Sequence, residues 1–320
     1  KDVSNKLYIE FKCLRDRLID FLVDSADGPK LPFLRAIETA QKLLDRILFI
    51  AFAQRTDLLP DKLLDRAAKA INEFDPQPIW TNFRSLFRRV DVGHANMAIP
   101  PYNGGLFAED DVADTLTIPD PLAGEMAALG EWDYRREVPV TVLGHIFEQS
   151  ISDIERMKAE SRGEEPPTVS KRKRQGVVYT PDNITRFLCE RTIGLTLKET
   201  FEALWQKYGL NNSGAPENEL AFWHEYLDAL RAMRIVDPAC GSGAFLVAAF
   251  DLLAGEYHRT IARVETLGGT IDFDSFDEIV TKNLYGVDLN AESVEITRLS
   301  LWLKTARRDH RLQNLEATIK

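Results

Sequence analysis

Apolar residues recur at spacings of three and four through much of the first half of this 320-residue chain. That spacing lines one face of a helix with apolar side chains. It predicts helices at about 7–22, 34–52, 60–74 and 142–154. Between about 90 and 132 the period fails and prolines and glycines recur, which predicts an irregular connection. We expect residues 1–157 to form a helical domain whose apolar stripes are its core.

The stretch 158–175 is hydrophilic and ends in a basic tetrad, Lys171, Arg172, Lys173 and Arg174. Such a composition has little to bury and predicts a flexible, charged linker. The tetrad has two interpretations, a contact to DNA phosphates or a solvated run of charge.

The pattern changes in the second half, 176–320. Ile235 and Val236 are β-branched and apolar, and they predict a short strand buried on both faces of a parallel sheet. A glycine turn follows, and then an apolar helix from Ala244. Leu284 to Val287 predicts a second strand that ends at Asp288, with a helix after it. Repeated strand and helix units predict an α/β domain that begins a doubly wound sheet.

Composition adds bounds to this picture. Hydrophobic residues make up 44% of the chain and charged residues 28%, which is ordinary for a globular protein. The net charge of −10 excludes an argument for nucleic-acid binding from overall charge. Three widely spaced cysteines favour a reducing cytoplasm over a disulfide framework. We find no signal peptide and no apolar run near the roughly 20 residues of a membrane span.

The turn Gly241-Ser242-Gly243 carries the candidate chemistry. Glycines allow positive φ and close approach of a ligand, and the next helix begins with unpaired N–H groups. The third glycine of a dinucleotide fingerprint is replaced by Leu246, and no lysine of a phosphate loop follows, so both of those sites are disfavoured. An acid, Asp237, stands instead at the strand end, where it can pair with a cationic amino acid group.

The run Asp237-Pro238-Ala239-Cys240-Gly241-Ser242-Gly243 resembles the S-adenosylmethionine (SAM) loop of class I methyltransferases, in the form common among DNA adenine methyltransferases. Upstream, Tyr179-Thr180-Pro181 resembles the segment that closes over the methionine end of SAM in those enzymes, and Thr180 and Pro181 also form a helix start, as N-cap and first helical residue. Downstream, the carboxylate of Asp288 has two oxygens for the ribose hydroxyls, although the same aspartate could cap the next helix. The resemblance implies a Rossmann-like fold and a SAM site that also includes Phe245 and Leu289, with Leu289 against the adenine.

The helical half extends the resemblance. Residues 45–60, 101–107 and 142–151 are similar to the helical region of type IIG restriction-modification enzymes, which join an endonuclease to a methyltransferase, and of related phage-defence methyltransferases. The family implies SAM-dependent adenine-N6 methylation of a base flipped out of duplex DNA. It also implies a fused or associated endonuclease.

One element of the family is absent from the sequence. Its catalytic motif, Asn/Asp/Ser-Pro-Pro-Tyr/Phe, should follow the third strand, and the chain ends at about that point. The run Ile99-Pro100-Pro101-Tyr102 starts with an apolar residue and precedes the SAM loop, so it is not that motif. We therefore expect a fragment that is inactive alone, with no catalytic residue and no metal ligand in this chain.

Other functions stay open at this stage. A methyltransferase acting on RNA or on protein glutamine would share the cofactor half, and a scaffold or partner-binding module with a SAM-like fold would need no catalytic motif. Cys240 is disfavoured as the nucleophile of carbon-5 cytosine methylation, because it lies in the cofactor turn. Glu10-Phe11-Lys12 is disfavoured as a nuclease motif, because it lies in a helical pattern.

Overall fold

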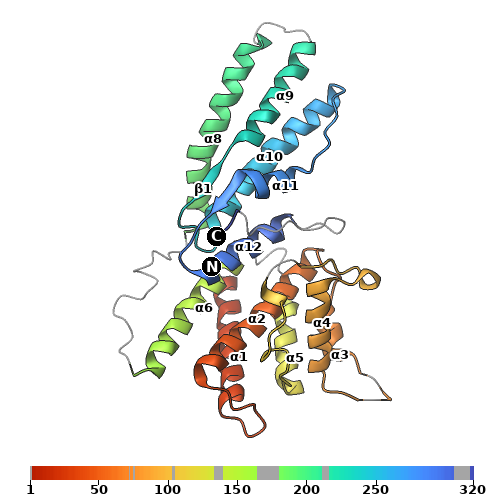
Figure 1. Ribbon diagram of the computed structural model, residues 1–320, viewed down its shortest axis with the longest axis vertical. Coiled ribbons are helices and arrows are strands. Elements are labelled where there is room, and N and C mark those ends of the chain that lie inside the picture. Colours follow the sequence, from red (N-terminus) through yellow and green to blue (C-terminus); the bar gives the residue numbers. More distant parts are fainter. Residues whose placement is uncertain are drawn as a thin grey trace. The chain divides into compact units, whose positions relative to one another are not determined.

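The computed structural model describes residues 2–71, 73–74, 76–102, 105–132, 140–163, 180–210, 216–305 and 318–320. These residues divide into two compact units, one built from residues up to 163 and one from residues 180 onward (Figure 1). Most of the predicted linker, including Lys171 to Arg174, lies outside the described residues. The domain boundaries at 157 and 175 therefore stay predictions, and the last described helix of the first unit runs through residue 157.

The first unit is helical in its described part. Its α-helices are α1 (Asp2–Val23), α2 (Phe33–Arg55), α3 (Leu63–Lys69), α4 (Trp80–Val92), α5 (Asp120–Ala128) and α6 (Val140–Ser161), with short 3-10 turns η1 (Ala95–Met97), η2 (Gly105–Phe107) and η3 (Leu129–Glu131). Helix α2 lies at the centre, since most of its residues are buried and it contacts α1, α3, α5 and α6. The other helices of the unit therefore cover α2 on several sides.

Two predictions for this unit were wrong in part. The helix expected at 60–74 is the shorter α3, and the connection expected from 90 to 132 contains the end of α4 and all of α5. In α5, Pro121 stands at the first turn, where the missing N–H of proline costs nothing. Pro121, which the sequence analysis assigned to an irregular connection, therefore lies at the start of a helix.

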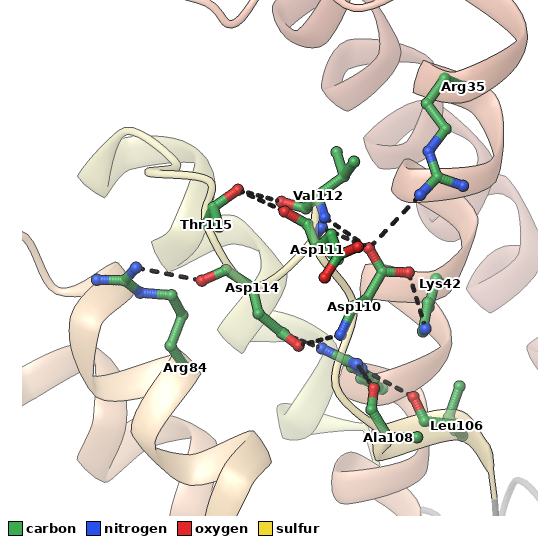
Figure 2. A network of polar contacts seen from close by, with 12 residues as sticks. Arg35, Lys42, Arg84, Leu106, Ala108, Asp110, Asp111, Val112, Asp114 and Thr115 are labelled. Carbon is green, nitrogen blue, oxygen red and sulfur yellow. Dashed lines mark hydrogen bonds and ion pairs between the residues drawn. The ribbon is translucent and has the colours of Figure 1, made fainter.

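Charged side chains hold the loop that follows η2 onto α2. The buried guanidinium of Arg46 donates to the backbone oxygens of Leu106 and Ala108, both at 2.9 Å, and to Oδ1 of Asp114 at 2.5 Å. Figure 2 shows Lys42 directed at Asp110, with the Nζ to Oδ2 distance 2.9 Å. Because these bonds satisfy a buried charge with several acceptors, the loop has a defined conformation despite its irregular sequence.

The second unit is an α/β fold. Its elements are α8 (Asp182–Lys207), α9 (Pro216–Ala232), β1 (Ile235–Asp237), α10 (Ala244–Thr266), α11 (Ser275–Glu278), the π-helical turn η5 (Ile279–Asn283), β2 (Leu284–Gly286) and α12 (Ala291–Thr305). Helices α8, α9 and α10 lie side by side (Figure 1). Helix α10, with 23 residues, takes up much of the interval between Asp237 and Asp288.

The sheet of this unit is parallel. Ile235 pairs with Leu284, Val236 with Tyr285 and Asp237 with Gly286. An isolated parallel bridge joins Gly286 to Ile319 on the other side of β2. The order β1, β2, Ile319 is the start of a doubly wound sheet, and within the described residues the Rossmann-like prediction is borne out only to that extent.

The prediction that β1 is buried on both faces was wrong. Ile235 packs against the core of the unit, which includes Leu246, Phe250 and Leu284. Successive side chains of a strand point to opposite faces. Val236 consequently points away from that core, and 64% of its surface is exposed.

Helix α8 also differs from its apolar pattern. The helix predicted to start at Thr180 and Pro181 is present, but its apolar side chains at Ile184, Phe187, Leu188 and Leu195 are 41–53% exposed. Its buried residues are Thr185, Cys189 and Leu197.

In the part of the chain that the structure describes, no helix has the length and apolarity needed to cross a lipid bilayer.

Candidate SAM-binding site

The glycine turn follows the carboxyl end of β1. Gly241 has φ +52° and Gly243 has φ +82°, both in the left-handed region that favours glycine. The N–H of Gly243 donates to the oxygen of Cys240 at 2.8 Å, which closes the turn, and α10 starts at the next residue. The backbone conformation predicted for this stretch is therefore present.

Asp237 and Asp288 come from neighbouring parallel strands. The N–H of Val287 donates to the oxygen of Asp237 at 2.9 Å, and the N–H of Cys240 donates to the oxygen of Val287 at 3.0 Å. These bonds extend the pairing of β1 and β2 to the ends where both carboxylates stand. The two side chains thus lie at the same edge of the sheet, where ligands of open α/β sheets bind.

The carboxylate of Asp288 also contacts the glycine turn directly. Its Oδ2 accepts the N–H of Gly241 at 2.9 Å, and its Oδ1 accepts the N–H of Asn290 at 2.8 Å. A carboxylate oxygen has two acceptor positions, so each oxygen keeps one for a further donor. The two hydroxyls of a ribose could donate to these two positions, one to each oxygen.

The alternative role of Asp288, as cap of the next helix, is taken by another residue. Oδ1 of Asn290 accepts the N–H of Ser293 at 3.2 Å, which is the bond of an N-cap, and α12 begins directly after Asn290. Asp288 instead accepts the N–H of Gly241 in the glycine turn and the N–H of Asn290 in its own loop.

Asp237 lies in surroundings that disfavour its charged form. Burial raises the pKa of Asp237 and the charge of Asp288 raises it further, while the N–H of Ala239, 3.2 Å from Oδ1, acts to lower it. A carboxylate with this environment is stabilised by a cation. The arrangement fits an ammonium group as the partner of Asp237.

A glycine is required at position 243 for a reason other than the approach of a ligand. A Cβ at this position would lie 2.9 Å from Cγ2 and 3.0 Å from Oγ1 of Thr297, a buried residue of α12. The hydroxyl of Thr297 also donates to the oxygen of Gly241 at 2.7 Å. The sequence pattern did not point to Thr297, since this residue belongs to none of the recognised motifs.

The residues of the upstream motif are placed only in part. Tyr179 lies outside the described residues, and Thr180 and Pro181 lie just before α8. The prediction of Thr180 as the N-cap was wrong by one position. Pro181 is the N-cap, and its oxygen accepts the N–H groups of Ile184 and Thr185 at 2.8 and 3.1 Å.

The other predicted residues differ in accessibility. Pro238 and Ala239 are exposed, Phe245 is half-buried, and Cys240 and Ser242 are buried. Burial raises the pKa of the Cys240 thiol to about 11. Leu289, predicted against the adenine, is 93% exposed. An exposed leucine beside Asp288 leaves apolar surface for a ring.

The groups around the glycine turn fit the parts of SAM. The turn contains two glycines with positive φ, Gly241 and Gly243. Around it lie Asp237, a carboxylate that favours a cation, Asp288, which has a further acceptor position on each oxygen, and the exposed Leu289. These groups match the methyl donor's ammonium, ribose and adenine, and no lysine for a phosphate is among them. Among the described residues, no group of three or more histidine, cysteine or acidic side chains could hold a metal ion.

Comparison with known proteins relates the chain to DNA methyltransferases. Residues 212–320 match the family model described as the MmeI DNA-methyltransferase domain. Three relatives are a type II restriction enzyme and methyltransferase of Methanocaldococcus jannaschii, the adenine-specific methyltransferase PglX of Lacticaseibacillus casei and DNA methyltransferase A of Bacillus subtilis. Their identities to this chain are 28%, 23% and 23%, over 82%, 79% and 87% of it.

The chain corresponds to 24%, 20% and 29% of the lengths of these three relatives. A solved structure of the type IIL restriction-modification enzyme MmeI in complex with DNA has a similar fold, with a TM-score of 0.59 and 21% identity. The match covers 96% of this chain and 36% of that one. The predicted resemblance is thereby confirmed: this chain is related to the DNA methyltransferases of restriction-modification systems, and its residues 212–320 match their MmeI domain family.

Proposed function

We propose that this chain binds SAM at the turn between β1 and α10. The observation that carries the proposal is the bond from Gly241 N–H to Asp288, which joins the glycine turn to the end of the neighbouring strand. Together with the parallel pairing of β1 and β2, this bond supports one site that contains the backbone of the turn and both acidic strand ends. Asp237 would hold the ammonium group of the amino acid moiety and Asp288 the ribose.

The remaining predicted residues have supporting roles in this proposal. Gly241, Ser242 and Gly243 form the backbone wall of the site, Pro238, Ala239 and Cys240 shape the approach to it, and Phe245 and Leu289 add apolar contacts. Tyr179, Thr180 and Pro181 would close over the methionine end. Exposure of Leu289 and of Pro238 supports their access to a ligand.

The reaction that we propose is methylation of the N6 amino group of adenine in duplex DNA. It rests on the names of the relatives, one an adenine-specific methyltransferase and one a restriction enzyme and methyltransferase. SAM, when bound, supplies an activated methyl group to an amine. The part of the chain's own residues is to orient the cofactor, and the target base must be turned out of the helix to reach it.

We further propose that the site works within a longer restriction-modification enzyme in the cytoplasm, with a fused or associated endonuclease. The 320-residue sequence has no Asn/Asp/Ser-Pro-Pro-Tyr/Phe run after the SAM loop to accept hydrogen bonds from the amine. The chain by itself is therefore expected to bind SAM without transferring its methyl group.

Isothermal titration of the 320-residue chain with SAM tests the first part of the proposal. We expect one site, competition by S-adenosylhomocysteine, and no binding of NAD. Radiolabelled methyl transfer by a full-length relative carrying these residues, with duplex DNA, RNA and protein as substrates, tests the second part. Absence of SAM binding would favour a scaffold instead, and label in RNA or protein would reassign the substrate.

A further inference from the structure

Thr297 is a buried polar residue on the face of α12 that packs against the glycine turn. Its side chain has no exposed surface. Its hydroxyl donates to the oxygen of Gly241 at 2.7 Å and lies 3.9 Å from the sulfur of Cys240. A buried hydroxyl directed at a loop carbonyl fixes that carbonyl more firmly than solvent can.

The methyl group of Thr297 has a separate contact. A Cβ at Gly243 would meet Cγ2 of Thr297 at 2.9 Å, closer than side-chain atoms normally come. Gly243 also has φ +82°, which a residue with a Cβ rarely adopts. One threonine therefore bonds the first glycine of the turn and limits the space at the second.

The turn is held from two sides by the segment that follows β2. Asp288 accepts the N–H of Gly241, and Thr297 donates to its oxygen. Asn290, which caps α12, lies between these two residues in the chain and receives a bond from Ser293. The polar groups of Gly241 on both of its peptide bonds are thus fixed by side chains, and the conformation of the turn depends on where α12 begins.

We infer that Thr297 is a positioning residue for the SAM site: it holds the glycine turn in the conformation that binds the cofactor, without touching the cofactor itself. This inference rests on the proposed function. It assigns a role in cofactor affinity to a residue outside the loop and outside both acidic strand ends.

The test uses Thr297→Val, which keeps the shape and removes the hydroxyl, and Thr297→Ser, which keeps the hydroxyl. Loss of a buried hydrogen bond predicts a SAM dissociation constant about tenfold higher for Thr297→Val, and a value within about threefold of the unmodified chain for Thr297→Ser. Amide hydrogen exchange in the absence of SAM is the second measurement. We expect faster exchange at 241–243 in Thr297→Val and not in Thr297→Ser.

Thr260 provides a matched control. It is equally buried and donates a 2.7 Å bond to the oxygen of Glu256, but within its own helix, α10. Thr260→Val should lower thermal stability much as Thr297→Val does while leaving SAM affinity and exchange at 241–243 unchanged.

The outcomes separate the inference from the proposed function. If the unmodified chain binds no SAM, the proposed function fails for this chain, and exchange at 241–243 still reports whether Thr297 orders the turn. If the unmodified chain binds SAM and Thr297→Val binds it equally well, the positioning role is overturned and the SAM site stands. Equal weakening by Thr260→Val would reduce the role of Thr297 to general stability.

Discussion

The backbone N–H of Gly241 donates a 2.9 Å hydrogen bond to Oδ2 of Asp288. The two residues follow different strands, and the bond couples the turn after β1 to the loop after β2. A charge-assisted bond of this kind is among the stronger hydrogen bonds in proteins. Any change to Asp288 should therefore alter both the proposed ribose contact and the order of the glycine turn.

Asp288→Asn is expected to raise the SAM dissociation constant at least about tenfold and to lower stability by about 1 kcal/mol, because an amide is a weaker acceptor than a carboxylate. Calorimetric titration and thermal unfolding measure the two effects. Asp274→Asn is the control, since Asp274 also accepts two backbone N–H groups, those of Phe276 and Asp277, away from the turn. It should lose stability and keep its affinity. Unchanged affinity in Asp288→Asn would argue against a ribose contact.

Asp237→Asn should separate stability from binding. The folded-state pKa of Asp237 is raised, so its ionisation favours the unfolded chain, and that penalty is present once the pH rises through the folded pKa. Removing the charge should raise the melting temperature at pH 7 by a few degrees, on the order of 1 kcal/mol, while SAM binding is lost. Melting curves from pH 4 to 8 check the sign. A variant that melts lower and binds normally would contradict both roles.

Leu289→Asp should weaken SAM binding with little effect on folding. Leu289 is 93% exposed, and substitution of such a residue changes stability by about 0.5 kcal/mol or less. Loss of its apolar contact and the added charge near Asp288 should raise the dissociation constant about fivefold to tenfold. Ile71→Asp, at a 73% exposed position of the first unit, is the matched control and should leave both SAM affinity and stability nearly unchanged. If both variants bind SAM alike, Leu289 is not an adenine contact.

Cys240 should be chemically inert. Its sulfur is buried and the thiol pKa of about 11 leaves on the order of one part in ten thousand ionised at pH 7. Iodoacetamide with peptide mass mapping should label the exposed Cys13 first and Cys240 only after unfolding. Cys240→Ala should still bind SAM. Rapid labelling of Cys240 in the folded chain would reopen its interpretation as a nucleophile.

The first unit should lose stability in acid through Asp153. This carboxylate of α6 accepts the hydroxyl of Tyr8 at 2.6 Å and Nη2 of the buried Arg15 at 3.1 Å, both on α1. Burial acts to raise the pKa of Asp153, but its bonds to Tyr8, Lys12 and Arg15 outweigh burial and hold that pKa below the usual value. A lowered folded-state pKa contributes stability above the unfolded value of about 4, and this stability is lost as the pH falls through the folded pKa.

Asp153→Asn leaves Arg15 buried beside an uncharged partner and should cost about 3 kcal/mol at pH 7, with a flatter dependence on pH below about 4. Urea unfolding from pH 3 to 7 compares the two chains. Arg156→Gln is the control, because the Arg156 guanidinium is about half exposed and lies 3.4 Å from the same carboxylate. Parallel acid slopes for Asp153→Asn and the unmodified chain would assign the acid sensitivity to other groups.

Much of the turn and its surroundings follows from local sequence. The two glycines within the seven residues 237–243 predict a turn with positive φ. An acid at the end of each short apolar strand predicts two carboxylates at one edge of the sheet, because the carboxyl ends of parallel strands meet there. Gly241, Gly243, Asp237 and Asp288 were all identified on these grounds. Helical periodicity likewise located α1, α2 and α6.

Other features depend on which elements pack together, and no local pattern carries that information. The apolar period of α8 is that of a buried stripe, yet the helix buries Thr185, Cys189 and Leu197 and leaves Phe187 exposed. Val236 belongs to an apolar strand and is exposed, since the described core covers the face of β1 on which Ile235 lies. Thr297 fills the space beside Gly243 from a helix far along the chain. Residue types and their spacing were enough to identify the turn as the candidate binding site. What holds the turn in shape is decided by contacts between distant segments, because these contacts depend on how side-chain volumes fit together.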